Sequence, residues 1–230
     1  MSPTQVQVQP LRRLQLGTSR LELLSTPARK VFVHRTWVHL GEPRRRNLKD
    51  VARRFIGCLP GQDSVEGMYR RTEFRPFWFN EGDRLNFEDG HFSFIYSEHF
   101  FEHLAPAVAR SLLKEAYRVL RPGGVMRTVV PDAIFRTYEP PEPENFPLHL
   151  PEGDPNKHKI RWSVYSLTES LRTAGLRAIP LDYCTAERQH VERAGRDLLP
   201  EYGCCAEPAL IADYSYILRV PSLIVDGIKE

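Results

Sequence analysis

Long apolar runs are missing from this chain of 230 residues. The amino-terminal segment MSPTQVQVQPLRRLQL lacks the apolar stretch of a signal peptide, and no later segment approaches the ~18 uninterrupted apolar residues that a spanning helix needs. We therefore expect a soluble, cytoplasmic protein with no membrane partner.

Cysteine is scarce, and the cysteines present do not form the spacings of a metal or redox motif. None of the four takes part in a CxxC pair, the spacing typical of zinc binding or thiol chemistry. Reduced thiols in the cytoplasm are the simplest interpretation. We assign no metal ligands from these residues, which are Cys58, Cys184, Cys204 and Cys205.

A strong charge of one sign is also missing, because the net charge is only +3. This small value argues against a protein built mainly to hold nucleic acid. Positive charge is nevertheless concentrated between residues 41 and 76, where nine Arg and Lys face five Asp and Glu. The segment PRRRNLKDVARRF, residues 43–55, predicts an amphipathic helix with a basic outer face. That face is either simply solvated or a docking surface for an acidic substrate or partner.

The order of apolar patterns predicts one α/β domain. Size and composition suit a single core, and alternating strands and helices favour a mainly parallel sheet covered on both faces. A basic helical insertion at about 41–76 and a proline-rich loop at about 139–157 interrupt this pattern. Predicted strands cover residues 11–17, 30–37, 91–96, 125–130, 178–184 and 222–229. Predicted helices cover residues 43–55, 106–120, 164–174 and roughly 185–198, and the glycines of RPGG (121–124) are expected to end the second helix.

Three strings between residues 82 and 132 carry a family resemblance. In order, they are GDRLNFEDGHFSFIYSEHFFEHL, LKEAYRVLRPGG and VMRTVVPD. Together they resemble the second half of class I S-adenosylmethionine (SAM) methyltransferases, in particular small predicted bacterial members with EHxxEHL and RVLxPGG motifs. The resemblance implies a Rossmann-like, seven-stranded sheet with an antiparallel last strand, SAM as cofactor, and methyl transfer to oxygen or nitrogen of a small molecule such as a sugar or specialised metabolite.

The resemblance also implies a set of site residues. Asp83 matches the acidic residue that faces adenine, and Ser97, Glu98 and His99 match positions beside the methionine part of the cofactor and the acceptor. The implied cofactor-binding residues are Leu16, Gly17, Thr18, Asp83, Arg84, Ser97 and Glu98.

Methyl transfer to a hydroxyl or protonated amine needs a proton acceptor, and histidine suits neutral pH. His99 and His158 are the two candidate bases, each with a structural role as the alternative. Asp132 either orients the acceptor or binds a cation, or it simply forms a turn. The string HFFEH (99–103) also fits the HxxEH pattern of inverted zinc peptidases, although the sequence shows no third-ligand signature.

Two features depart from the family pattern. The glycine-rich turn is reduced to LQLGTSRLELL, where Gly17 remains but Ser19 and Leu21 replace later glycines. The second predicted strand ends in His34 and Arg35, where relatives carry an acidic residue for the ribose. The alternative function is therefore a methyltransferase-fold protein that no longer transfers methyl groups and serves as a binding, scaffold or repurposed protein. The aromatic connection of residues 73–90 is a candidate homodimer surface.

Overall fold

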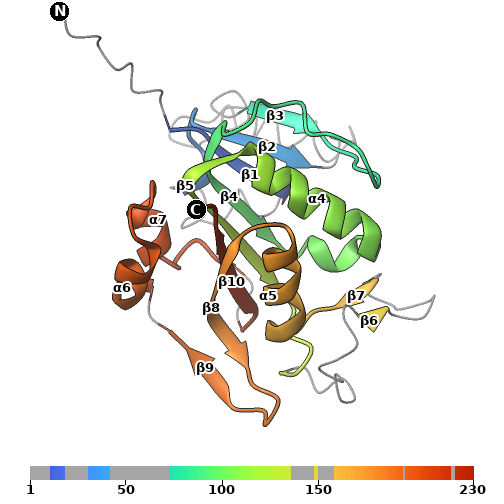
Figure 1. The fold of residues 1–230 in the computed structure, drawn as a ribbon, viewed down its shortest axis with the longest axis vertical. Helices are drawn as coiled ribbons and strands as arrows, with labels where there is room; N and C mark the ends of the chain where they lie inside the picture. Colours follow the sequence, from blue (N-terminus) through green and yellow to red (C-terminus); the bar gives the residue numbers. More distant parts are fainter. Residues whose placement is uncertain are drawn as a thin grey trace, which may run out of the picture.

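A computed structural model describes residues 11–18, 31–41, 73–135, 148–149, 158–193, 195–218 and 221–230. Within these ranges eight strands form one sheet in the order β3-β2-β1-β4-β5-β10-β8-β9 (Figure 1). The predicted basic helix at 43–55 and most of the proline-rich loop lie outside the described residues. Among the residues placed here, no helix is both long enough and apolar enough to cross a bilayer.

The sheet is mainly parallel, as predicted. Parallel pairing joins β3 (Glu73–Pro76), β2 (Trp37–Gly41), β1 (Arg13–Thr18), β4 (Phe92–Glu98) and β5 (Leu120–Val130). The last strand, β10 (Leu223–Ile228), runs antiparallel between β5 and β8 (Arg177–Cys184). The predicted antiparallel last strand is therefore confirmed.

Helices cover both faces of the sheet (Figure 1). α4 (Pro106–Val119) and α5 (Val164–Thr173) pack on one face through buried leucines such as Leu112 and Leu167. The Ser163 hydroxyl caps α5 by accepting from the N–H groups of its first turn. The other face is covered by α6 (Gly195–Leu198), the 3-10 helix η3 (Leu199–Tyr202) and α7 (Pro208–Ala212).

The second strand lies seven residues after its predicted start. Residues 31–32 are helical, the Nδ1 atom of His34 bonds the Thr36 hydroxyl at 2.9 Å in a turn, and β2 begins only at Trp37. All five residues of β2 are buried, so the strand shows no alternation for a sequence pattern to detect. The residue that follows Gly41 in the chain is Glu42. The prediction that the second strand ends in His34 and Arg35, with no acidic residue after it, was wrong.

Two further boundaries differ from prediction. α4 ends at Val119 and β5 begins at Leu120, so RPGG lies inside the strand and not in a turn. Gly123 has φ +72° and its N–H donates to the Lys229 carbonyl at 2.7 Å, in an irregular start to β5. The helix predicted at 185–198 is confirmed only at its end, where α6 covers Gly195–Leu198. Earlier in that range, β9 (His190–Glu192) pairs with β8 as an antiparallel edge strand. A short ladder between β6 (Leu148–His149) and β7 (Ile160–Arg161) stands apart from the main sheet.

Candidate functional site

The carboxyl ends of β1, β4 and β5 lie side by side. Leu16 of β1 is the register partner of Ser97 in β4, which in turn is level with Thr128 in β5. Open α/β sheets bind ligands in the crevice beyond this edge. Gly17, His99 and Asp132, which follow these positions in the chain, are therefore at the edge where the resemblance expects the site.

Gly17, the last residue but one of β1, has a conformation that suits glycine, with φ +71°. A side chain at this position would place its Cβ only 2.2 Å from Cγ of Phe100. The aromatic ring therefore lies directly on the glycine backbone, at the point where a cofactor would approach β1. Leu16 beside it is 1% exposed and belongs to the core, and Thr18 is the last residue of the strand.

Phe100 is part of an aromatic layer over the ends of β1 and β2. Its ring centroid is 6.1 Å from that of Phe77, and Phe77 is 6.0 Å from Phe79. The N–H of Phe77 donates to the Gly41 carbonyl at 2.8 Å, which ties the layer to the end of β2. Trp78 between the two phenylalanines points outward and is 71% exposed.

Asp83, expected to face adenine, is exposed in a turn. Its Oδ2 accepts hydrogen bonds from the backbone N–H and side-chain amide of Asn80, at 2.7 and 3.1 Å. The neighbouring Gly82 N–H donates to the Ser111 hydroxyl of α4 at 3.0 Å. Arg84 forms an exposed pair with Asp89 at 3.6 Å. These contacts account for both residues as parts of a surface turn beside α4.

Ser97 and Glu98 point to opposite faces of the sheet. Glu98 accepts from the Tyr96 hydroxyl at 2.9 Å and from the Leu218 N–H at 2.8 Å, so it braces the face covered by α6 and α7. Ser97 is completely buried, and among the described residues its hydroxyl has no hydrogen-bond partner; the same holds for Thr128 beside it. A buried hydroxyl without a partner costs free energy, so this pair is suited to meet a polar ligand group.

Glu102 connects the two candidate bases. His99 follows β4 with a left-handed φ of +49°; its Nε2 is 3.0 Å from the Ser222 hydroxyl and its Nδ1 is 3.4 Å from Oε1 of Glu102. His103 Nε2 lies 3.8 Å from the same oxygen, and the His103 and His158 rings are 4.9 Å apart. Glu102 itself is 1% exposed.

Sequence reasoning did not include Glu102 among the catalytic residues of a methyltransferase. Only the zinc-peptidase pattern HFFEH drew attention to it, and that pattern paired His99 with His103. In the structure His99 lies beside both Ser222 and Glu102. Glu102, His103 and His158 lie together, with one potential ligand atom each within 4.8 Å of the others. The HFFEH string therefore contributes Glu102 and His103 to this cluster, and His158 joins it from a distant segment.

Asp132 is held by backbone groups. Oδ1 accepts from the N–H groups of Ile134 and Phe135, and Oδ2 accepts from the N–H of Cys184 at the end of β8. Burial raises the pKa of Asp132, and these backbone hydrogen bonds oppose that rise. Of the predicted roles, which were orienting the acceptor, binding a cation and forming a turn, these contacts match the turn former, since they join the end of β5 to β8.

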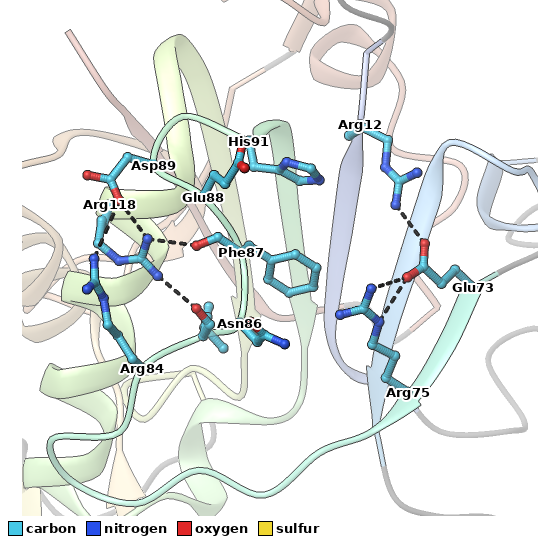
Figure 2. Close-up of a pocket in the computed structure, with 11 residues that line it drawn as sticks. Arg12, Glu73, Arg75, Arg84, Asn86, Phe87, Glu88, Asp89, His91 and Arg118 are labelled. Atoms are coloured by element: carbon cyan, nitrogen blue, oxygen red, sulfur yellow. Dashed lines mark hydrogen bonds and ion pairs between the residues drawn. The ribbon is translucent and has the colours of Figure 1, made fainter.

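A cavity of about 760 Å³ lies at the other end of the sheet, next to the amino ends of the strands (Figure 2). Arg12, which precedes β1, and His91, which precedes β4, line it, together with Glu73 at the start of β3. Arg12 and Arg75 both pair with the Glu73 carboxylate, as Figure 2 shows. Because Arg12, Glu73 and His91 lie at or just before the amino ends of their strands, this cavity is separate from the carboxyl edge.

Comparison with known proteins agrees with the topology. A family model described as a methyltransferase domain matches residues 34–128, less than half of the chain. The chain has the methyltransferase fold. A search of curated protein sequences gives no match.

Several solved structures share this fold. The [4+2]-cyclase SpnF has a TM-score of 0.52 and 16% identity, over 95% of this chain and 75% of that one. Burkholderia thailandensis 1,6-didemethyltoxoflavin-N1-methyltransferase, with 1,6-didemethyltoxoflavin and S-adenosylhomocysteine bound, has a TM-score of 0.51 and 14% identity, over 96% of this chain and 72% of that one. A SAM dependent methyltransferase from Archaeoglobus fulgidus has a TM-score of 0.51 and 14% identity, over 95% and 86%. At these identities the methyltransferase-fold likeness concerns the fold alone.

Proposed function

We propose that this chain is a SAM-dependent methyltransferase that acts on oxygen or nitrogen of a small molecule, such as a sugar or a specialised metabolite. The observation that carries the proposal is the convergence of His99 and His158 on the buried Glu102 carboxylate, at the edge of a methyltransferase fold. The matching family model supports the reaction class. The toxoflavin-precursor methyltransferase of similar fold supports a small nitrogen-containing acceptor as one option.

The residues at the end of β1 and β4 fit the cofactor on two counts. Gly17 leaves no Cβ between the backbone and a ligand, and the buried Ser97 hydroxyl offers a polar group without a partner in the described structure. Glu42 follows β2 in the chain and matches the acidic residue that relatives direct to the ribose. When bound there, SAM would supply an electrophilic methyl group. For the cofactor to reach Gly17, the Phe100 ring must turn away.

The proton of the acceptor would be accepted by His99 or His158, with Glu102 as the supporting carboxylate. If the acceptor is a hydroxyl or a protonated amine, an imidazole nitrogen of His99 or His158 would take up its proton. The Glu102 carboxylate, 3.4 Å from Nδ1 of His99, would orient that imidazole and stabilise the resulting imidazolium. Because Glu102 is buried, water screens this interaction little.

A second function is favoured by one specific observation, the ring of Phe100 on Gly17. The [4+2]-cyclase SpnF has the same fold and is described by a different reaction. In this second proposal the chain keeps the fold, with Phe100 closing the cofactor crevice, and serves as a binding, scaffold or repurposed catalytic protein.

Calorimetric titration with SAM and with S-adenosylhomocysteine separates the two proposals. The wild type and Phe100→Ala are titrated in parallel, because the variant removes the ring that covers Gly17. Saturable micromolar binding, tighter in Phe100→Ala, supports methyl transfer and justifies an acceptor screen. Absence of heat and of thermal stabilisation at millimolar ligand, in both proteins, contradicts methyl transfer and favours the second function.

A further inference from the structure

We infer that Glu102, His103 and His158 form a binding site for one divalent transition-metal ion, with Zn²⁺ as the best match. Each residue offers one ligand atom, and the three atoms lie within 4.8 Å of one another. Two imidazole nitrogens and one carboxylate oxygen are a ligand set of catalytic zinc sites, which keep a fourth position for water or a substrate atom.

The backbone, and not only the side chains, brings the three residues together. Glu102 and His103 are consecutive in the 3-10 helix η2 (Phe101–His103). The N–H of Lys159, the residue after His158, donates to the Glu102 carbonyl at 2.7 Å. This hydrogen bond fixes the chain around His158 against η2, so the ligand set spans two segments that are far apart in the sequence.

To hold zinc, the three ligand atoms, which lie within 4.8 Å of one another, must move closer by at most roughly 1.5 Å. Ligands at ~2.0–2.1 Å from a tetrahedral zinc are roughly 3.3–3.4 Å apart. Glu102 Oε1 and His103 Nε2 are already 3.8 Å apart. The His103 side chain is 41% exposed, which gives an ion a path from solvent, while the buried Glu102 supplies the negative charge. Two imidazoles favour zinc and its transition-metal neighbours over Mg²⁺ and Ca²⁺, which prefer oxygen ligands.

His99 is placed to act as a positioning residue for this site. Its Nδ1 is 3.4 Å from Oε1 of Glu102, and its Nε2 is 3.0 Å from the hydroxyl of Ser222, the residue before β10. Ligating carboxylates and imidazoles are commonly oriented by such outer contacts. The chain Ser222–His99–Glu102 therefore ties the ligand oxygen to the sheet.

The metal site does not depend on the proposed methyl transfer. If both are correct, His158 is a metal ligand and His99 remains the base, with the open metal position available to polarise the acceptor oxygen or nitrogen. If methyl transfer is absent, metal binding is still measurable by itself.

The test is calorimetric titration of the full-length, chelator-treated protein with ZnCl₂ in SAM-free buffer, followed by Co²⁺ absorption spectra. The variants are His103→Ala, His158→Ala and Glu102→Gln. The matched control is His190→Ala, which removes a half-exposed histidine paired with Asp182 at 2.6 Å in the β8–β9 hairpin. A Cys204→Ser/Cys205→Ser double variant removes the adjacent thiols, the other zinc-binding groups that the sequence places side by side.

One equivalent of Zn²⁺ is expected for the wild type, the His190 control and the cysteine variant. The three ligand variants are expected to bind at least about tenfold more weakly, the scale on which changes around a metal site lower its affinity. Unchanged binding in His103→Ala and His158→Ala, loss of binding only in the cysteine variant, or no zinc binding by the wild type overturns the inference. If Glu102→Gln fails to fold, the two histidine variants decide the result. A separate SAM titration of the same samples shows whether the proposed function fails independently.

Discussion

Gly17 and Phe100 pack so closely that a methyl group at residue 17 would lie 2.2 Å from Cγ of the phenylalanine ring. The contact joins the end of β1 to the residue that follows His99 after β4. It therefore connects the position expected to approach the cofactor with the loop that carries the candidate bases. The effect of this contact on the free energy of unfolding can be measured in the protein without ligand.

Gly17→Ala is expected to destabilise the protein for two reasons. Overpacking against Phe100 costs about 1–3 kcal/mol, and the left-handed backbone at residue 17 adds about 1–2 kcal/mol for a residue with a Cβ. Urea unfolding of Gly17→Ala, Phe100→Ala and the double variant separates the terms. The double variant should recover the overpacking part only; strict additivity of the two single effects would show that the contact is not formed.

Asp83→Ala distinguishes a turn residue from an adenine ligand. Loss of the hydrogen bonds from Asn80 should lower the free energy of unfolding by about 0.5–1 kcal/mol. Asn80→Ala is the matched control, because it removes the side-chain hydrogen bond but keeps the carboxylate. If Asp83 binds adenine, SAM affinity falls in Asp83→Ala and not in Asn80→Ala. Equal SAM binding by the two variants would leave Asp83 with the turn alone.

The buried pair of Arg127 and Asp226 should be the most costly ion pair to break. Both side chains are 0% exposed and join β5 to β10 at 2.8 Å, and Arg127 also donates to the carbonyls of Leu210 and Ile211 around α7. Arg127→Met leaves a buried, unpaired carboxylate, at a cost of about 3–5 kcal/mol.

Two comparisons check this explanation by chemical unfolding. The double variant Arg127→Met/Asp226→Leu should recover much of the loss, because no buried charge remains. Arg177→Met, which breaks an exposed pair with Glu230, should change stability little. Equal losses in Arg127→Met and the double variant would mean that the buried charge is not the cause.

The burial of His39 is expected to make the free energy of unfolding depend on pH. Burial lowers its pKa to about 4, against the smaller opposing effect of its hydrogen bond to the Phe32 carbonyl, whereas the unperturbed value is 6.5. Because the folded protein holds the neutral form, this contribution is fully present above pH 6.5 and is lost as the pH falls toward 4. The loss reaches about 3 kcal/mol.

Urea midpoints between pH 7 and pH 4 measure this effect. His39→Gln should flatten the curve, whereas His34→Gln, at an exposed histidine, should leave it unchanged. If His39→Gln and the wild type lose stability in parallel between pH 7 and pH 4, then groups other than His39 cause the loss of stability at low pH.

Several elements could be predicted because their signals are local. α4 begins at Pro106 and carries apolar residues at helical spacing, and β4 is a run of aromatic and β-branched residues. The position of β2 was not predicted correctly, because a strand buried along its whole length shows no alternation of apolar and polar residues. The preceding segment KVFV is equally apolar, and its pattern predicts the strand there instead. The edge strand β9 was not predicted because it is short and polar, as edge strands often are.

In the candidate site, too, some features could be predicted from the sequence and others depend on the tertiary structure. The sequence alone predicted the fold class and placed Ser97 and His99 at the carboxyl edge of the sheet, and it offered His158 as a candidate base. These predictions were possible because the order of elements along the chain and the spacing of motifs are visible in local sequence. Only the tertiary structure brought His158 to Glu102 and His103, placed Phe100 on Gly17 and turned Asp83 toward Asn80. These contacts depend on side-chain packing between segments distant in the chain, and no local pattern determines which of several compatible neighbours a side chain meets.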